Sequence, residues 1–372
     1  MDKIIYPERF TTLDVLAPVP LAGILALFLY GHLGLDPWVP VALLLTVFPF
    51  LFAASIGWYV LYVVLRKTTY SVLLFTLALV LAAFRYTDFI MPTDVSGVEQ
   101  SSSIRVMTWN VQRMGYFDTR EHVPTNLDAA TAKIRHAQPD VLVLQEISRR
   151  HLNALQRRLG LQSNACHWTD YHGRGIDHLG GLAICVINDR EWTILTKRSL
   201  DLPPSWKYLF VEIADRRDQT FNLLGLHLVP PKVTEDGVRE MTGKTMRLDM
   251  SAFSDLLDTL REYRTQIHLQ ENQIQKVIER IQNFRDPTVM AGDFNTPPDL
   301  PLHYRLRGQF QDAWGLAGTG LGYTRVWGGF LPLRIDFIYA SKSLAVGTAG
   351  NLDAGVSDHR PVIATLYLNS DS

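Results

Sequence analysis

Polar side chains that can bind metal ions or transfer protons follow short apolar runs at five places in the sequence. Each run has the length and composition of a buried strand, so the polar residue behind it would stand at a strand end. The five segments are Thr108-Trp109-Asn110, Leu144-Gln145-Glu146, Leu226-His227-Leu228, Gly292-Asp293-Phe294-Asn295 and Ser357-Asp358-His359. Carboxylates, amides and imidazoles gathered at one edge of a sheet would suit phosphoester hydrolysis.

The first pair predicts a metal site. A phosphodiester repels nucleophiles, so its hydrolysis needs a divalent cation, an activated water molecule and donors to the developing charge. Mg²⁺ prefers oxygen ligands and keeps several waters, so one or two carboxylates and an amide oxygen suffice. Glu146 and Asn110 supply these atoms. Taken singly, Asn110 could instead cap a turn and Glu146 could start a helix.

Asp293 and Asn295 stand two residues apart, so an extended chain places their side chains on one face. The carboxylate could orient or deprotonate a water molecule, and the amide could hold a phosphate oxygen. The alternative is an Asx turn before Thr296-Pro297-Pro298.

Two histidines complete the set. His359 could stabilise the pentacoordinate phosphate as a cation if a partner orients its ring. Asp336 is the candidate partner, because an acid inside an apolar strand needs a cation or a donor; the alternative is an ion pair with Arg334. His227 could donate to phosphate or protonate the leaving oxygen, or be a satisfied core histidine.

Other polar clusters are less specific. His167, His172 and His178 lie among glycines without the cysteine spacing of a zinc site, so we interpret this segment as a partly exposed loop. The chain has two cysteines, Cys166 and Cys185, which could pair in an exported compartment or be two small buried residues.

The elements that must position these groups alternate between short apolar strands and helical patterns. Continuous apolar strands are those covered on both faces, which predicts interior sheets with helices outside. The predicted strands are 104–109, 141–145, 182–187, 209–213, 222–228, 289–292, 335–340 and 362–368. Helices are expected from about Thr125 to Ala137 and over 245–283, the latter as a cover helix, with a lid or membrane-surface helix as the minority interpretation.

The first hundred residues predict membrane segments. No Asp, Glu, Lys or Arg occurs between Asp14 and Asp36, from 37 to 65, or from 68 to 84. A bilayer-crossing helix needs roughly 20 mostly apolar residues, with a range of about 17 to 25; all three runs qualify, the third only just, and aromatic residues flank them. We therefore expect three transmembrane helices; buried helices of a soluble domain, or a signal peptide for the first run, are the alternatives.

Basic residues predict the orientation of these spans. Lys3 and Arg9 precede the first run and Arg66-Lys67 separate the second from the third, which places the amino terminus in the cytoplasm. Three spans then leave the later domain outside the inner membrane, although Arg85 after the third run weighs against this. The first hundred residues hold five of the 36 basic and seven of the 37 acidic residues, so the remainder is almost neutral, unlike a dedicated nucleic-acid binder.

Six motifs in order resemble the endonuclease/exonuclease/phosphatase superfamily, also called DNase I-like. They are Thr-Trp-Asn-Val at 108–111, Leu-Gln-Glu at 144–146, Leu-His-Leu at 226–228, Gly-Asp-Phe-Asn at 292–295, Arg-Ile-Asp-Phe-Ile at 334–338 and Ser-Asp-His-Arg-Pro-Val at 357–362. The resemblance implies a four-layer α/β sandwich. We expect residues 1–92 to form the three-span region, 93–102 a tether and 103–372 this domain.

The resemblance also implies roles and a cofactor. Mg²⁺ or Mn²⁺ would be bound by Glu146 and Asn110 with Asp358 close by. Asp293 would position water, Asn295 the phosphate, and the His359–Asp336 pair the transition-state charge. Abasic-site endonucleases of this family typically carry aspartate and tyrosine where this sequence has Gln112 and His227. The sequence is more similar to the DNase I, sphingomyelinase and inositol-phosphatase branches.

Three functions follow as hypotheses. The first is a membrane-anchored phosphodiesterase or phosphatase acting on a lipid headgroup, since the tether holds the domain near the bilayer. The apolar segment Val326–Leu333 could touch the acyl boundary or pack as an ordinary loop. The second is an extracytoplasmic nuclease with Arg149, Arg150, Arg157, Arg158, Arg174 and Lys207 along a groove. The third is a non-catalytic scaffold.

Overall fold

The computed structural model describes residues 11–33, 35, 38–90, 103–115, 123–171, 180–203, 206–230 and 251–368. The predicted tether at 93–102, residues 172–179 and 245–250 lie outside the described residues. The chain divides into two compact units, Met1–Thr87 with Asp299–Pro301, and Asp88–Pro298 with Leu302–Ser372.

The first unit is helical. Its elements are α1 (Thr12–Leu16), α2 (Val19–His32), α3 (Val39–Thr46), α4 (Phe48–Arg66) and α5 (Thr69–Ile90). Two helical stretches, Thr12–His32 and Phe48–Arg66, are long and apolar enough to cross a membrane, and only 22% and 28% of their most apolar windows are buried within the chain. They are therefore unlike the core helices of a soluble domain, whereas a signal sequence would share the features of the first.

Among the described residues two helical stretches, rather than the three predicted, are long and apolar enough to cross a membrane. In the third helix, the apolar part Thr69–Ala83 is shorter than a bilayer-crossing stretch. Arg85 and Asp88 interrupt the apolar run before the helix ends at Ile90.

Asp14 is the one acidic side chain in the first two described apolar helical stretches, and it is fully partnered. The Arg66 Nη2 donates to Asp14 Oδ2 at 2.7 Å, and the Tyr62 hydroxyl donates to Asp14 Oδ1 at 2.6 Å. A buried carboxylate needs such partners to offset its desolvation. This cluster joins the beginning of α1 to the end of α4.

The second unit contains two six-stranded sheets and a two-stranded hairpin. The first sheet has the order β13-β14-β1-β2-β4-β3, and the second β5-β6-β7-β8-β12-β9. Their bounds are β1 (Ser103–Asn110), β2 (Val141–Gln145), β3 (Cys166–Asp170), β4 (Gly181–Val186), β5 (Trp192–Leu202), β6 (Trp206–Asp215), β7 (Thr220–His227), β8 (Thr288–Asp293), β9 (Phe310–Asp312), β12 (Asp336–Ser341), β13 (Leu344–Asn351) and β14 (Val362–Leu368). The hairpin consists of β10 (Arg325–Trp327) and β11 (Leu331–Leu333).

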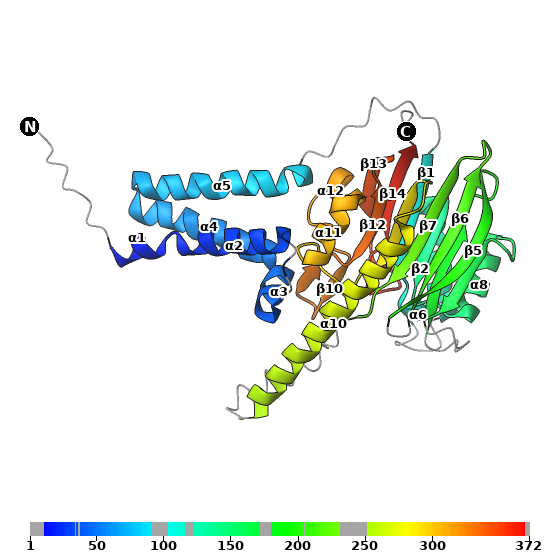
Figure 1. Cartoon of the computed structure of the whole chain (residues 1–372), viewed down its shortest axis with the longest axis horizontal. Helices are drawn as coiled ribbons and strands as arrows, with labels where there is room; N and C mark the ends of the chain where they lie inside the picture. The colour runs from blue at the N-terminus through cyan, green and yellow to red at the C-terminus, as the bar shows by residue number, and fades with distance from the viewer. Residues whose placement is uncertain are drawn as a thin grey trace, which may run out of the picture. The chain divides into compact units, whose positions relative to one another are not determined.

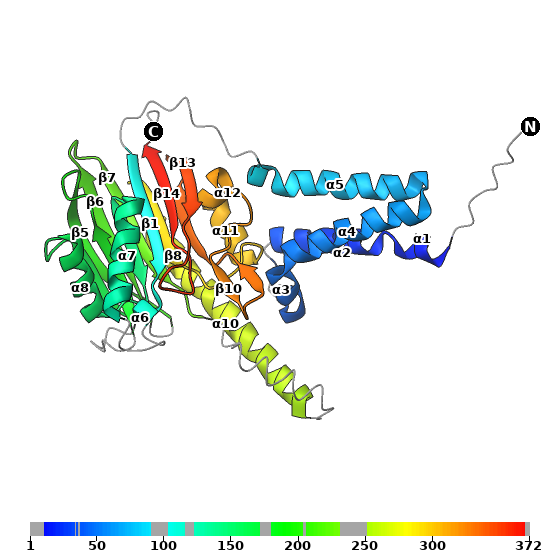
Figure 2. The ribbon, with the colours of Figure 1, turned by 180° about the vertical axis from the view of Figure 1, so that it is seen from behind.

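The helices of this unit are α6 (Gln112–Gly115), α7 (Val123–Ala137), α8 (Arg149–Leu159), α10 (Ser251–Ile281), α11 (Pro301–Gln309) and α12 (Ala313–Ala317). Figure 1 shows α10 crossing the face of one sheet, and Figure 2 shows α7 and α8 on the opposite side of the unit. The predicted helix ending at Ala137 and the long cover helix are thus present within the described residues.

Three hydrophobic clusters hold these layers together. One contains side chains from both sheets, such as Val143 and Leu223, and therefore fills the space between them. Another packs Leu127 and Ile134 of α7 against the first sheet. The third packs Val277 of α10 against the second sheet. The order is helix, sheet, sheet, helix, which agrees with the predicted α/β sandwich.

All eight strands predicted from apolar runs are present. Strand β8 shows why: Val289 and Ala291 lie in the cluster between the sheets, while Met290 lies in the cluster beneath α10. A strand covered on both faces needs apolar side chains at every position, and that continuous pattern is visible in the sequence.

Strand pairing carries the predicted site residues to one edge. In the first sheet, parallel pairing opposes Asn110 to Gln145, the residue before Glu146. In the second sheet, Asp293 lies opposite His227 on β7 and opposite Asp336 on β12. The β7–β8 approach requires glycine at 292, because a Cβ there would lie 1.9 Å from the Leu226 carbonyl oxygen.

Candidate active site

The buried Asp293 carboxylate is the point at which the predicted site residues meet. Its Oδ2 accepts a hydrogen bond from Asn110 Nδ2 at 3.0 Å, and the same amide nitrogen donates to Glu146 Oε1 at 3.1 Å. His227 Nε2 lies 3.6 Å and His359 Nε2 3.8 Å from that oxygen. Residues from both sheets therefore face one small volume, as the strand-end pattern predicts.

The other Asp293 oxygen organises the chain that follows it. Asp293 Oδ1 accepts the Asn295 backbone N–H at 2.8 Å, and Asn295 Nδ2 donates to the Leu228 carbonyl at 2.9 Å. The Asx turn that was the alternative interpretation is thus present, and it coexists with the approach of Asp293 to the other site residues. The role of Asn295 in holding phosphate stays a prediction.

Asp336 and His359 form the expected pair. Asp336 Oδ2 lies 2.8 Å from His359 Nδ1, and both side chains are buried. Arg334, the alternative partner of Asp336, binds Asp312 instead. Its guanidinium donates to both carboxylate oxygens of Asp312, at 2.9 and 2.7 Å.

His359 is a cation at neutral pH. Burial alone lowers its pKa, but the carboxylates of Asp336 and Asp293 outweigh burial and raise the pKa of His359 to about 9. Burial, the largest effect, also raises the pKa of Asp336, so the two groups compete for one proton. We place that proton on the imidazole, because its ring faces two carboxylates.

Two sets of residues at the site could hold a metal ion. Asp293, Asp336 and His359 offer ligand atoms within 4.8 Å of one another and could hold a metal by spacing. A protonated His359 cannot ligate, however, so a metal there would have to displace the proton shared with Asp336. This set is better suited to an ion-pair network.

Of the predicted metal ligands, Glu146 and Asp358 offer carboxylate oxygens that suit a hard cation. Asp358 Oδ1 is a buried atom without a hydrogen-bond partner among the described residues, while Asp358 Oδ2 pairs with the Arg325 guanidinium at 2.9 Å. Glu146 adds a half-buried carboxylate held by Asn110. Unsatisfied carboxylate oxygen is the kind of ligand that Mg²⁺ and Mn²⁺ prefer.

Asn110 is oriented differently from the expected ligand. Its Oδ1 accepts the Gln112 backbone N–H at 3.0 Å, and its amide nitrogen faces Glu146 and Asp293. Exchanging the amide oxygen and nitrogen would place the NH₂ group against the Gln112 N–H, which is also a donor. The hydrogen bonds around Asn110 therefore determine the orientation of its amide. In this arrangement Asn110 holds two carboxylates together, and its metal ligation stays a prediction.

Tyr171 is a site residue that the sequence analysis missed. Its buried hydroxyl accepts the Glu146 backbone N–H at 2.6 Å and lies 2.7 Å from His227 Nδ1. We assign the hydroxyl proton to His227 Nδ1, because this nitrogen is the acceptor within hydrogen-bond range of a hydroxyl whose other contact is with a donor. His227 therefore carries its ring proton on Nε2, which points toward Asp293.

The strand end that carries His227 is fixed by further contacts. The indole of Trp206 stacks on Tyr171 with ring centroids 4.9 Å apart and donates to the His227 carbonyl oxygen. Gln273 of α10 accepts the Val229 N–H at 3.1 Å, and Gln270 donates to the Val229 carbonyl at 2.7 Å. None of these residues carries a sequence signal beyond its residue type.

Backbone conformation at the site is uncommon. Glu146 and Asn295 have φ values of 55° and 52°, in the left-handed region that non-glycine residues rarely adopt. Such conformations persist where the surrounding contacts fix them and occur often at functional sites.

The two cysteines form a disulfide, Cys166–Cys185, between the paired strands β3 and β4. The two cysteines are therefore paired, rather than being two separate small buried residues. His167, on the same strand, lies 3.2 Å from Ser199 Oγ. The rest of the histidine cluster, His172 and His178, lies outside the described residues.

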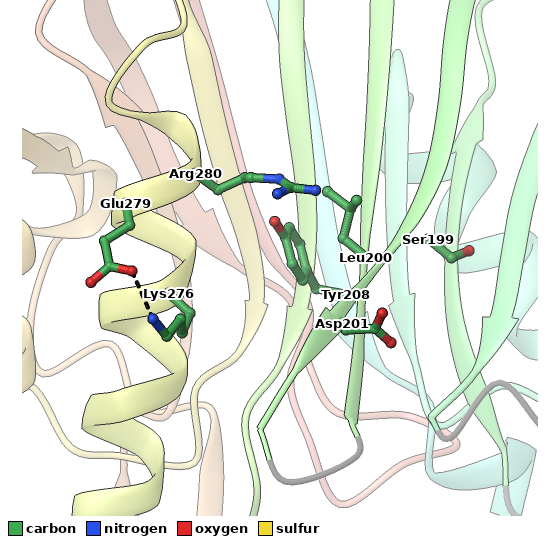
Figure 3. A pocket seen from close by; sticks show the side chains of 7 residues that line it. All are labelled: Ser199, Leu200, Asp201, Tyr208, Lys276, Glu279 and Arg280. Atoms are coloured by element: carbon green, nitrogen blue, oxygen red, sulfur yellow. Dashed lines mark hydrogen bonds and ion pairs between the residues drawn. The ribbon is translucent and has the colours of Figure 1, made fainter.

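A separate cavity of about 440 Å³ lies between α10 and strands β5 and β6 (Figure 3). None of its lining residues belongs to the Asp293 cluster; they are Ser199, Leu200, Asp201, Tyr208, Lys276, Glu279 and Arg280. Figure 3 shows Arg280 reaching from α10 toward Leu200 and Tyr208, while Lys276 pairs with Glu279 at 2.9 Å. Acids and bases balance there, so the cavity does not resemble a phosphate site.

Comparison with known proteins decides the family. The model of the endonuclease/exonuclease/phosphatase family matches residues 107–359, which is more than half of the chain and contains every predicted site residue. The chain belongs to this family. No curated protein matches the sequence closely enough to serve as a relative.

Solved structures of the family share the fold at low sequence identity. The endonuclease/exonuclease/phosphatase from Bacteroides vulgatus has a TM-score of 0.54 and 16% identity over 72% of this chain and 100% of its own. The protein of the same description from Beutenbergia cavernae has a TM-score of 0.52 and 20% identity, covering 72% of each chain. Zebrafish (D. rerio) TDP2 complexed with a single-strand DNA product has a TM-score of 0.52 and 16% identity over 72% of this chain and 99% of its own.

Removal of the Tyr171 hydroxyl should impair the site without unfolding the domain. In Tyr171→Phe, the Glu146 N–H loses its acceptor and His227 Nδ1 its donor, so we expect about a tenfold to hundredfold loss of phosphodiester hydrolysis. Nitrogen-15 spectra of labelled histidine should show that His227 no longer holds its proton on Nε2 alone. Tyr208→Phe, at another buried tyrosine, is the control; an unchanged His227 spectrum in Tyr171→Phe would contradict the assignment.

Loss of Asp336 should move the alkaline limit of activity. The raised pKa means that the His359 imidazolium prevails below about 9 and is lost as pH rises through that value. In Asp336→Asn the largest stabilising charge disappears, so the alkaline limb of the pH–rate profile should shift toward the ordinary histidine value of about 6.5. A variant whose alkaline limb stays near that of the parent would show that another group titrates there.

Proposed function

We propose that this chain is a divalent-metal-dependent phosphoesterase that cleaves a phosphodiester by in-line attack of water at a membrane surface. The observation that carries the proposal is the shared contact of Asp293 with Asn110, His227 and His359. A buried carboxylate in contact with two imidazoles and an amide is suited to activating water beside an anionic group.

Each residue has a role that its contacts support. Asp293 orients and deprotonates the attacking water. The Nε2 proton of His227 hydrogen-bonds a phosphoryl or leaving oxygen, and the His359 imidazolium stabilises the charge that develops on the phosphate. Asp336 and Tyr171 position the two imidazoles through Nδ1.

Glu146 and Asp358 are the residues that would hold Mg²⁺ or Mn²⁺. When bound, such an ion supplies Lewis-acid polarisation of the phosphate and offsets its negative charge. Asp358 Oδ1, which accepts no hydrogen bond among the described residues and lies 3.9 Å from His359 Nε2, supports this assignment.

A lipid headgroup is the substrate class that we favour. The two apolar helices are compatible with membrane anchoring, which would raise the local concentration of the catalytic domain over lipid substrates. The alternative, a nuclease, is supported by the zebrafish TDP2 structure, whose ligand is a DNA product.

The predicted basic groove gives the nuclease little additional support. Arg158 pairs with Asp128 and Lys207 with Asp201, so two of its six members are already neutralised. Arg149 lies 5.6 Å from the Trp168 ring, and Arg174 lies outside the described residues. A non-catalytic scaffold is disfavoured because it has no need of so many buried polar groups at one point.

The disulfide supports an extracytoplasmic location for the catalytic domain. Disulfides persist in oxidising compartments and are rare in the cytosol. A domain exported after two spans requires an exported amino terminus, which is opposite to the orientation predicted from Lys3 and Arg9, so the proposed location rests on the disulfide rather than on a count of helices.

The metal requirement is tested with the full-length chain in detergent and bis(p-nitrophenyl) phosphate as the phosphodiester. Chelation should abolish hydrolysis, and Mg²⁺ or Mn²⁺ should restore it. Glu146→Gln should lower the rate by at least about a hundredfold and weaken Mn²⁺ binding, because a ligand is lost. Glu191→Gln, at an exposed acid, should behave like the parent; equal activity of Glu146→Gln and the parent would refute the metal role.

The same preparation distinguishes the substrate classes. Vesicles containing sphingomyelin or phosphoinositides and, separately, plasmid and single-stranded DNA should be offered with Mg²⁺. Release of a headgroup product with intact DNA supports the lipid assignment, whereas DNA cleavage alone establishes the alternative.

The location is tested by reporters fused after Ser372. An alkaline phosphatase fusion should be active, and a green fluorescent protein fusion dark, if the domain is exported. The opposite result would place the domain in the cytoplasm and predict that Cys166 and Cys185 are reduced in cells.

A further inference from the structure

A short hairpin in the catalytic unit, formed by β10 and β11, exposes apolar side chains to solvent; β10 is labelled in Figure 1. Strands β10 and β11 pair with Val326 opposite Pro332, and the turn passes through Gly328 and Gly329. Phe330 is 74% exposed and Val326 41%, and the neighbouring Leu321 is 44% exposed. An isolated exposed leucine is ordinary, but three large exposed apolar side chains within ten residues need an explanation.

The base of the hairpin is attached to the candidate active site. Arg325 pairs with Asp358 and forms a β-bridge with His359. The Arg360 N–H donates to the Thr324 carbonyl at 2.6 Å, while Thr324 Oγ1 accepts the Asp336 N–H at 3.2 Å. The apolar tip is thus rigidly connected to the segments that carry His359 and Asp336.

The charge and aromatic content of this segment fit the headgroup region of a bilayer. No acidic residue occurs between Asp312 and Asp336. Arg325 lies at the hairpin base, and the Arg360 guanidinium lies 4.1 Å from the Tyr323 ring. Trp327 packs edge-on against Phe330, with ring centroids 6.4 Å apart. Tryptophan, tyrosine and arginine are residues that membrane interfaces favour.

The number of exposed apolar side chains argues against a protein partner. A stable protein interface buries about 800 Å² on each side, with some 20 residues. Leu321 before the hairpin, Val326 on β10 and Phe330 in the turn are too few for that. They suffice to enter the acyl boundary if another part of the chain supplies attachment.

We propose that the hairpin tip, Val326 to Phe330, inserts into the surface of the bilayer to which the chain's own apolar helices attach it. Insertion holds the His359 segment against the lipid headgroups, so the hairpin selects substrates presented at a membrane. This inference rests on the membrane attachment and lipid substrate proposed above, and its experiment measures insertion rather than hydrolysis.

The test uses the full-length chain reconstituted into vesicles of phosphatidylcholine and phosphatidylglycerol. Since both native cysteines are paired, Phe330→Cys provides a single site for an environment-sensitive fluorophore. Lipids with a shallow nitroxide should quench this probe at least about twofold, as expected for a depth of 5 to 10 Å, and aqueous iodide should quench it weakly. Val326→Cys should give the same result, which guards against a local effect of one substitution.

Leu195→Cys is the matched control, because Leu195 is 53% exposed on β5, away from the hairpin. Its probe should be quenched by iodide and not by nitroxide lipid. Iodide quenching of the 330 and 326 probes as strong as that at 195 would overturn the proposal. So would protection from iodide without nitroxide quenching, which would mean that protein covers the hairpin.

Hydrolysis provides a separate comparison. Phe330→Asp should reduce headgroup release from vesicles about tenfold or more while bis(p-nitrophenyl) phosphate hydrolysis stays unchanged. Insertion without any hydrolysis would contradict the proposed function and leave the membrane contact established. Equal vesicle rates for Phe330→Asp and the parent would overturn the role of the hairpin in substrate selection.

Discussion

The burial of one charged carboxylate, that of Asp293, constrains the arrangement of the whole catalytic unit. Only 1% of this residue is exposed, so its charge must be compensated by nearby donors rather than by water. Those donors come from different strands: Asn110 ends β1, His227 ends β7, and His359 precedes β14. The two sheets must therefore stack with these strand ends in register, and the apolar cluster between them provides that stacking.

Contacts at Nδ1 fix the two imidazole rings that compensate the charge of Asp293. Tyr171 and Asp336 each contact the Nδ1 atom of one imidazole and leave its Nε2 atom toward Asp293. The left-handed backbone at Glu146 and Asn295 costs of order 1 to 3 kcal/mol at each residue. Continuous apolar burial along strands such as β8 offsets that cost. The site is preorganised before substrate arrives, which is the condition for effective electrostatic stabilisation of a transition state.

The parts of this arrangement that could be predicted from sequence are those with a repeating physical cause. Strands covered on both faces show unbroken apolar runs, so eight of them and the polar residues at their ends could be located. Strand β5 was not predicted, because it is largely exposed and contains Lys197 and Arg198. Tyr171 follows β3, whose five residues are mixed in character, and its role depends on contacts with distant residues. The orientation of the Asn110 amide could not be predicted because it depends on a single backbone N–H, that of Gln112. The extent of the third apolar run could not be predicted because α5 continues past its charged residues.

The charge balance of the site supports the proposal that a divalent cation binds there. Four carboxylates gather there, those of Glu146, Asp293, Asp336 and Asp358, while the cations that contact them among the described residues are His359 and Arg325. Even with Arg113, whose charge acts on Tyr171, acids outnumber bases. An anionic phosphoester would be repelled by such a site. A divalent ion reverses that balance, and it would do so at the Glu146 and Asp358 side, because the proton shared by His359 and Asp336 already neutralises the other side. In the proposed mechanism Glu146 and Asp358 would hold the metal, the His359 imidazolium would supply the second positive charge, and Asp293 would act on the attacking water.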